Sequence, residues 1–262
     1  MKILFIGDVV GKSGRRALRR FLPELQDETE ADLTVVNAEN AAGGFGVTAG
    51  VLEEFLEQSE IDVLTSGNHI WDKREALDLI QDEPRLLRPH NYPEDTPGSG
   101  WIVATASNGV RVGVLNIMGT VFMHPTLDCP FSSANLAIEK KPSDVHAILV
   151  DFHAEATSEK IAMARMLDGH VSVVVGTHTH VQTADEFIFP GGTAFLCDAG
   201  FTGPHDSVLG RDWEPVVERF LTSQPRRFPV AKERVLLQGL MVEVDGATGK
   251  ALTVERVSEP LS

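Results

Sequence analysis

Side chains that commonly bind metal ions follow five apolar, strand-like segments of this 262-residue chain. Ligands of α/β folds collect at the carboxyl ends of strands, so we expect these side chains to meet in one crevice. Carboxylate, amide and imidazole groups together suit divalent transition metals such as manganese, iron, zinc or cobalt. They outnumber the ligands of one tetrahedral ion, whereas two ions that share a bridging carboxylate would use them all. The residues are Asp8, Glu39 and Asn40, Asn68 and His69, His153, and His178 and His180.

The segment Gly176-Thr177-His178-Thr179-His180 is the densest of these groups. It follows a β-branched run, residues 171–175, that is typical of a buried strand. If the backbone stays extended, His178 and His180 point to the same side, with Cα atoms about 6.6 Å apart. That spacing lets the two imidazoles bind one ion, or one each of two ions about 3.5–4 Å apart. The alternative is a pair of solvated or turn-capping histidines.

Each candidate ligand also has an ordinary structural interpretation. Asp8 precedes a predicted helix and would serve as its N-cap, and the two asparagines are of a type common in turns. Glu39 would pair with an arginine such as Arg15, and His153 would be a hydrogen-bonded core histidine. All of these interpretations would have to hold at neighbouring strand ends at once, and we therefore favour a shared metal site.

The stretch Gly7-Asp8-Val9-Val10-Gly11-Lys12-Ser13 is similar to a nucleotide-binding P-loop. The Walker pattern has four residues between its glycines, whereas this stretch has three. The loop is therefore one residue short, and the carboxylate of Asp8 would occupy the place of the phosphates. These two features argue against a P-loop NTPase.

Strand-like and helix-like segments alternate in the first half of the chain, and hairpins are expected in the second half. Strands are expected at 2–7, 33–37, 61–66, 101–105, 110–117, 147–152, 171–175, 186–189, 194–198, 234–245 and 251–257, and helices at 12–27, 48–57, 74–82, 158–167 and 214–221. Ser158 is expected to be an N-cap, Ser107-Asn108-Gly109 a hairpin turn, and residues 118–133 and 199–210 loops. The mixture predicts an α/β fold, a four-layer α-β-β-α sandwich of two mixed sheets. We expect a single domain, residues 1–262.

Composition restricts the class of partner. The formal net charge of −15 argues against broad electrostatic binding to DNA or to anionic membranes. A phosphate-bearing substrate remains compatible, because bound cations invert the local charge. Two cysteines are too few for a disulfide framework, and the apolar run at residues 3–6 is too short for a signal sequence or a membrane span. We therefore expect a cytoplasmic protein.

The motifs resemble those of the calcineurin-type metallophosphoesterases, and within them the bacterial YmdB-like family. Gly67-Asn68-His69 and His153 match motifs of the superfamily, and residues 176–180 match its Gly-His-x-His motif with one inserted Thr. Val10 stands where most members have a metal-binding His, and Asn37-Ala38-Glu39-Asn40 replaces the bridging Asp motif. Both departures are features of the YmdB-like branch, as are Gly-Asp-Val-Val-Gly at 7–11 and the stretch at 202–210. The resemblance covers essentially the whole chain.

The resemblance implies a ligand set for each of two metal ions, iron or manganese. Asp8, Glu39, Asn40 and His180 would hold one ion, and Glu39, Asn68, His153 and His178 the other, with Glu39 bridging. Asn40 would replace the ligand lost at Val10. His69 would lie beside the ions and donate a proton to the leaving oxygen. Family members often self-associate, so a homo-oligomer is expected.

The activity that the resemblance implies is hydrolysis of a small phosphate ester, with 2′,3′- or 3′,5′-cyclic AMP as the expected diester substrate. Two cations would clamp the phosphoryl oxygens and acidify a bridging water, which gives a hydroxide nucleophile near neutral pH. His69 would then act as the general acid. Two alternatives remain open: a phosphomonoesterase with the same mechanism, and a regulatory protein that senses nucleotides through its metal site with little turnover.

Two further loops are candidates for substrate contact. Residues 43–46, Gly-Gly-Phe-Gly, offer backbone N–H groups to a phosphate, although a simple tight turn explains them equally well. Residues 202–205 would contact phosphate or base, or would pack as an ordinary loop.

Overall fold

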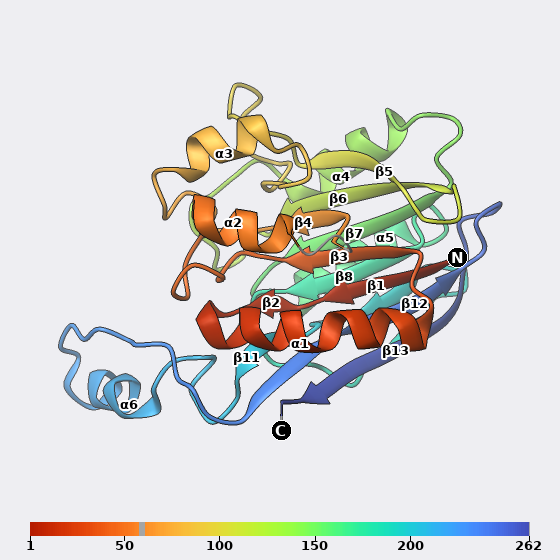
Figure 1. The fold of residues 1–262 in the computed structure, drawn as a ribbon. Helices are drawn as coiled ribbons and strands as arrows, with labels where there is room; N and C mark the ends of the chain where they lie inside the picture. The colour runs from red at the N-terminus through yellow and green to blue at the C-terminus, as the bar shows by residue number, and fades with distance from the viewer. Residues whose placement is uncertain (58–60, 262) are drawn as a thin grey trace.

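The computed structural model describes residues 1–57 and 61–261 (Figure 1). Its helices are α1 (Gly11–Thr29), α2 (Ala49–Leu56), α3 (Ala76–Asp82), α4 (Pro130–Glu139), α5 (Thr157–Leu167) and α6 (Trp213–Thr222). Its strands are β1 (Lys2–Ile6), β2 (Asp8–Val9), β3 (Leu33–Asn37), β4 (Val63–Thr65), β5 (Trp101–Thr105), β6 (Arg111–Met118), β7 (Ala147–His153), β8 (Val173–Thr177), β9 (Phe187–Ile188), β10 (Ala194–Leu196), β11 (Phe201–Pro204), β12 (Val235–Val244) and β13 (Ala251–Pro260).

The strands form two mixed sheets. The first has the order β2-β11-β12-β1-β3-β4, with β13 also paired to β12. Within it β1, β3 and β4 run parallel, whereas β12 is antiparallel to β1 and β13. The second has the order β5-β6-β7-β8-β10-β9, with a parallel centre from β6 to β10 and an antiparallel strand at each edge. The prediction of two mixed sheets is therefore confirmed.

The first sheet divides its side chains between two apolar layers. Successive side chains of a strand point to opposite faces, so Leu4 and Ile6 of β1 join the core under α1 and α2. Ile3 and Phe5 of the same strand pack instead against the second sheet. Figure 1 shows α1 lying across the outer face of the first sheet.

The second sheet repeats this arrangement from the other side. Leu149 of β7 faces the first sheet, whereas its neighbours Ile148 and Val150 pack outward. That outer core includes Met163 and Leu167 of α5, together with residues of α4. Helices, sheet, sheet and helices thus form the four-layer α-β-β-α sandwich that the sequence predicts.

Two expected loops contain regular structure, and one expected cap is wrong. Residues 118–133 were expected to be a loop, but α4 begins at Pro130, whose fixed φ suits the first turn of a helix. Residues 199–210 contain β11, which forms because β2 and β12 offer it partners. Ser158 lies inside α5, and Ala156 occupies the N-cap position.

The hairpin predicted over residues 101–117 is confirmed. β5 and β6 pair antiparallel, and Gly109 in the turn between them has a φ of 85°.

Among the described residues, no helix is both long and apolar enough to cross a lipid bilayer.

Candidate metal centre

Four donor atoms converge on one point at the carboxyl ends of β3, β4, β7 and β8. Nε2 of His153 lies 3.0 Å from Glu39 Oε2, 3.1 Å from Asn68 Oδ1 and 3.1 Å from His178 Nδ1. A ring nitrogen makes one good hydrogen bond, so hydrogen bonding alone does not account for three such neighbours. Two donors about 2.1 Å from one cation, at right angles, lie about 3.0 Å apart. The spacing therefore fits donors arranged around a cation.

A second group of donors surrounds Nε2 of His180. Asn40 Oδ1 lies 3.1 Å from this nitrogen, and Asp8 Oδ1 lies 3.7 Å from it. The other ring nitrogen of His180, Nδ1, is 3.2 Å from the carbonyl oxygen of Leu209, to which it donates. The amide nitrogen of Asn40 likewise donates to Gly44 O at 3.1 Å. These two hydrogen bonds leave Nε2 of His180 and Oδ1 of Asn40 pointing into the site.

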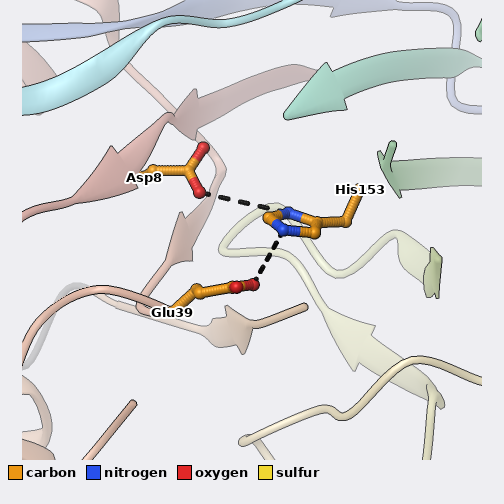
Figure 2. Close-up of side chains that lie close together, drawn as sticks. All are labelled: Asp8, Glu39 and His153. Carbon is orange, nitrogen blue, oxygen red and sulfur yellow. Dashed lines mark ion pairs between the residues drawn. The ribbon is translucent and has the colours of Figure 1, made fainter. Parts of the chain in front are cut away.

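Two buried carboxylate oxygens lack hydrogen-bond partners at this place. They are Asp8 Oδ1 and Glu39 Oε2, and the 3.0 Å approach of His153 to Glu39 lacks hydrogen-bond geometry. Figure 2 shows the ring of His153 between the two carboxylates. Ligand atoms of these three residues all lie within 4.8 Å of one another. Because an unpaired buried carboxylate is costly, the donor set fits bound divalent cations.

Electrostatics favour the charged form of the Asp8 carboxylate. Burial alone would raise the pKa of Asp8, but the positive charges of His180 and His153 hold it well below its usual range. Burial also lowers the pKa of His153, and the negative charges of Glu39, Asp8 and Asp151 outweigh it and raise that pKa to about 9. Burial, with the charge of His153, lowers the pKa of His178 to about 3. His178 is therefore neutral near pH 7 and offers a lone pair.

Gly67 lets the backbone after β4 pass against the donor atoms. A Cβ added at this position would lie 1.9 Å from Glu39 Oε2 and 2.2 Å from Cδ2 of His153. Both neighbours are buried and cannot move aside without leaving the site. The glycine of the Gly67-Asn68-His69 motif is thus required by close approach.

His69 lies beside the donor groups. Its backbone N–H donates to Glu39 Oε1 at 2.9 Å, which fixes the residue next to the carboxylate. Its Nδ1 lies 2.8 Å from Asp72 Oδ2, and the side chain is 28% exposed. The Asp72 contact leaves Nε2 available to a bound molecule.

The backbone between the two histidines of residues 176–180 is not extended. β8 ends at Thr177, and His178 and His180 have φ values of 93° and 60°. The extended backbone on which the predicted spacing depends is therefore not present, and each histidine reaches its donor group from a turn. Asp198 holds the turn, since its Oδ2 accepts the backbone N–H of Thr179 at 3.1 Å and the Thr179 hydroxyl at 2.7 Å.

Two of the ordinary interpretations do not describe these residues. Arg15 pairs with Glu54 at 2.6 Å rather than with Glu39. Val10 occupies the N-cap of α1, so Asp8 is not its cap. His153 is a buried, hydrogen-bonded histidine as that interpretation supposed, and its Nε2 also faces the donor groups.

The Gly-rich loop after Asn40 is held by an arginine that the sequence analysis missed. Arg211 donates from Nη2 to Gly44 O at 2.6 Å, and its guanidinium lies 4.0 Å from the centre of the Phe45 ring. Phe45 in turn lies 4.9 Å, ring centre to ring centre, from His69. The stretch 202–205 belongs largely to β11, whose pairing with β2 places Phe201 opposite Asp8. Because β11 pairs with β2, Asp8 is held in a strand and does not lie in a free loop.

Polar residues that were not predicted from the sequence also lie near the donor groups. Asp151, Thr65 and Thr177 are fully buried, and both threonine hydroxyls hydrogen-bond to the aspartate. Glu155 approaches the far nitrogen of His178, Nε2, at 3.3 Å. The available signal was an Asp within the apolar strand Ala-Ile-Leu-Val-Asp-Phe-His, since an aspartate in such a setting needs partners.

Comparison with known proteins identifies relatives along nearly the whole chain. The sequence model of the family described as YmdB-like protein matches residues 4–257. A protein of Bacillus subtilis (strain 168) named 2′,3′-cyclic-nucleotide 2′-phosphodiesterase is 47% identical over 257 residues, which cover 98% of this chain and 96% of that protein.

Two crystal structures share the fold. A hypothetical protein from Thermus thermophilus has a TM-score of 0.92 and 36% identity, with 99% of each chain covered. A novel phosphatase from Mycoplasma pneumoniae has a TM-score of 0.93 and 34% identity, with 99% of this chain and 93% of that chain covered. These matches confirm the resemblance drawn from the motifs, and the chain belongs to the YmdB-like protein family.

Proposed function

We propose that this protein is a metal-dependent phosphodiesterase that hydrolyses a small phosphate diester, a cyclic nucleotide with 2′,3′-cyclic AMP as the first candidate. The observation that carries the proposal is the convergence of Glu39, Asn68 and His178 on Nε2 of His153, beside buried carboxylate oxygens without hydrogen-bond partners. The choice of a diester is supported by the name of the Bacillus subtilis relative.

We assign the donor atoms to two ions. The group around His153 would hold one ion, and the group of Asp8, Asn40 and His180 would hold the other. Glu39 would bridge them, since its Oε2 lies in the first group and its carboxylate lies within reach of Asp8. The mixture of imidazole, carboxylate and amide ligands favours iron or manganese among the divalent metals. The charges of Asp8 and Glu39 would balance part of the charge of the two cations.

When bound, the cations would supply positive charge to the phosphoryl oxygens and acidify a water molecule. The side chains of this protein would orient the general acid and protonate the leaving oxygen. Asp72 accepts from Nδ1 of His69 and holds the ring, so that the opposite nitrogen, Nε2, presents a proton to the leaving oxygen. The anchoring of the His69 backbone on Glu39 keeps this donor at a fixed place beside the ligands.

We expect the substrate to be a small molecule, because the negative net charge of the protein disfavours binding of long nucleic acids. A phosphomonoesterase would use the same residues, and a nucleotide sensor would bind without turnover. Self-association and a cytoplasmic location stay predictions.

The decisive experiment measures metal content and hydrolysis together. Protein purified without added metal, and again after loading with Mn²⁺ or Fe²⁺, is compared with Glu39→Ala and with Glu53→Ala, a matched change on the exposed face of α2. We expect about two ions per chain in the wild type and in Glu53→Ala, a strong loss in Glu39→Ala, and turnover of 2′,3′-cyclic AMP that follows the metal. Failure of the loaded wild type to bind metal would overturn the proposal.

Relative rates on substrates then separate the remaining alternatives. Faster hydrolysis of p-nitrophenyl phosphate than of bis-p-nitrophenyl phosphate and 2′,3′-cyclic AMP would assign a phosphomonoesterase. Tight binding of the nucleotide without hydrolysis, in fully loaded protein, would assign a sensor.

A further inference from the structure

Asp151 is a fully buried carboxylate in β7 that accepts three hydrogen bonds. Its Oδ1 accepts from the hydroxyl of Thr177 at 2.7 Å. Its Oδ2 accepts from the hydroxyl of Thr65 at 2.5 Å and from Nδ2 of Asn37 at 3.0 Å. All four side chains are completely buried, so no bulk water competes for these bonds.

These contacts determine which way the Thr177 hydroxyl points. A hydroxyl carries one hydrogen, and the carboxylate of Asp151 only accepts. The hydrogen of Thr177 is therefore directed to Asp151, which leaves the Thr177 oxygen as an acceptor. That oxygen lies 2.9 Å from Nδ1 of His153, so Nδ1 carries a hydrogen and donates it.

The consequence appears at the opposite nitrogen of the same ring. A neutral imidazole carries one hydrogen, so a hydrogen retained on Nδ1 leaves a lone pair on Nε2. Nε2 is the atom on which Glu39, Asn68 and His178 converge. We propose that Asp151 and Thr177 are positioning residues that keep the hydrogen of His153 on Nδ1 and aim the Nε2 lone pair at the metal centre. This inference rests on the function proposed above.

The same carboxylate links the strands that carry the ligands. Asn37 accepts the backbone N–H of Glu39 through its Oδ1 at 3.1 Å, so Asp151 is joined to the segment that positions the bridging ligand. Asn37 and Thr65 are register partners on β3 and β4, and His153 and Thr177 are register partners on β7 and β8. Asp151 therefore connects the ends of four strands across the two sheets.

The test compares two substitutions of Thr177 that differ in the hydroxyl group. Thr177→Val keeps the shape and removes the hydroxyl, whereas Thr177→Ser keeps the hydroxyl. Loss of such a partner to a metal-binding histidine costs about 10–100-fold in metal affinity. We expect that loss of Mn²⁺ affinity in Thr177→Val, measured by titration calorimetry, and affinity close to that of the wild type in Thr177→Ser. Thr105→Val, at the exposed end of β5, is the matched control.

A second readout follows the hydrogen itself. In ¹⁵N-histidine NMR spectra of Zn²⁺-loaded protein, and of metal-free protein at a pH high enough for a neutral ring, we expect a slowly exchanging Nδ1–H of His153 in the wild type and in Thr177→Ser. In Asp151→Asn, the Asn oxygen would remain with Asn37 and Thr65, so the amide NH₂ would face Thr177 and reverse its hydroxyl. The single hydrogen of a neutral ring would then lie on Nε2, so we expect loss of the Nδ1–H signal together with loss of Zn²⁺ from Nε2 of His153, with the fold checked by thermal unfolding.

The outcomes separate this inference from the proposed function. Wild-type metal affinity in Thr177→Val, or a His153 ring without a hydrogen on Nδ1 in the wild type, would overturn the inference while leaving the phosphodiesterase proposal intact. A wild type that binds no Mn²⁺ but shows the Nδ1–H would overturn the proposed function, and with it the metal-directing part of the inference.

Discussion

Lys160 and Asp198 form an ion pair, 2.8 Å between Nζ and Oδ2, with both side chains 1% exposed. Oδ2 of Asp198 also holds Thr179, the residue between the two histidines of residues 176–180. Those histidines have positive φ values. This conformation costs about 1–3 kcal/mol at each such residue, and it persists only where the surrounding structure holds it. The ion pair therefore lies directly behind the turn that positions His178 and His180.

Replacement of Lys160 by Met should destabilise the fold and weaken metal binding together. Removal of one partner leaves the charge of Asp198 buried and unpaired, at a cost of about 3–5 kcal/mol. Urea unfolding of the metal-free protein measures this loss, and Mn²⁺ titration measures the second effect. Lys140→Met on the exposed surface is the control, and equal stability of the two variants would contradict the prediction.

Gly67→Ala should abolish metal binding. The added Cβ would overlap both Glu39 Oε2 and the ring of His153, so at least one of these two candidate ligands must leave its place. Elemental analysis after Mn²⁺ loading should show a metal content well below that of the wild type. Gly50→Ala, where a Cβ meets open space in α2, should retain full content.

His69→Asn should slow catalysis without removing metal. Loss of a general acid typically costs about 10²–10⁴-fold in rate. We expect a decrease of this size in kcat for 2′,3′-cyclic AMP, with wild-type metal content. His170→Asn, an exposed residue outside the site, should leave both unchanged. A much smaller decrease for p-nitrophenyl esters, whose leaving group needs no proton, would assign the role to protonation.

Metal binding should release a proton near neutral pH. Burial lowers the pKa of His153, but the charges of Glu39, Asp8 and Asp151 raise it to about 9, so the metal-free protein carries that proton at pH 7. A cation must displace it, and Mn²⁺ affinity should therefore rise by about tenfold per pH unit and level off near pH 9. Calorimetry in buffers of different ionisation enthalpy counts the proton. Heats that do not depend on the buffer would contradict the prediction.

The same pKa predicts the opposite trend for the stability of the metal-free protein. The folded-state pKa of His153 lies above the value of about 6.5 expected in the unfolded chain. Its contribution to stability is therefore fully present below about pH 6.5 and is lost as the pH rises through about 9. Thermal unfolding of the metal-free wild type from about pH 6.5 to 9.5 should show this decrease, and His153→Gln should reduce the slope.

Arg211→Met should affect one metal position more than the other. Arg211 and Nδ2 of Asn40 both donate to the carbonyl of Gly44, so loss of the guanidinium frees the loop that holds Asn40. We expect weaker binding at the position of His180 and near wild-type binding at the position of His153. Two-step Mn²⁺ titrations distinguish the two, with Arg74→Met as an exposed control. Equal loss at both positions would contradict this assignment.

Local patterns were sufficient to predict most elements and the candidate ligands. The strand β3, for example, was predicted with the bounds that it has in the structure, because its apolar run is bordered by polar residues on both sides. β11 and α4 were not predicted. β11 is four residues long and exists through its pairing with β2 and β12, which lie far from it in the sequence. Short segments of this kind depend on tertiary partners.

The sequence by itself determined the chemical types of the donors and their places after strands, because alternation and chain direction are local properties. It also contained five polar residues that lie at or near the ends of their strands, on the same face as the apolar side chains of the core between the sheets. They are Asn37, Thr65, Asp151, His153 and Thr177. Only the tertiary structure decided that these residues meet, because the contacts join positions separated by 24 to 114 residues. The bent backbone at His178 and His180 was likewise settled by the fold, since Asp198 and Lys160 hold a conformation that these residues rarely adopt alone.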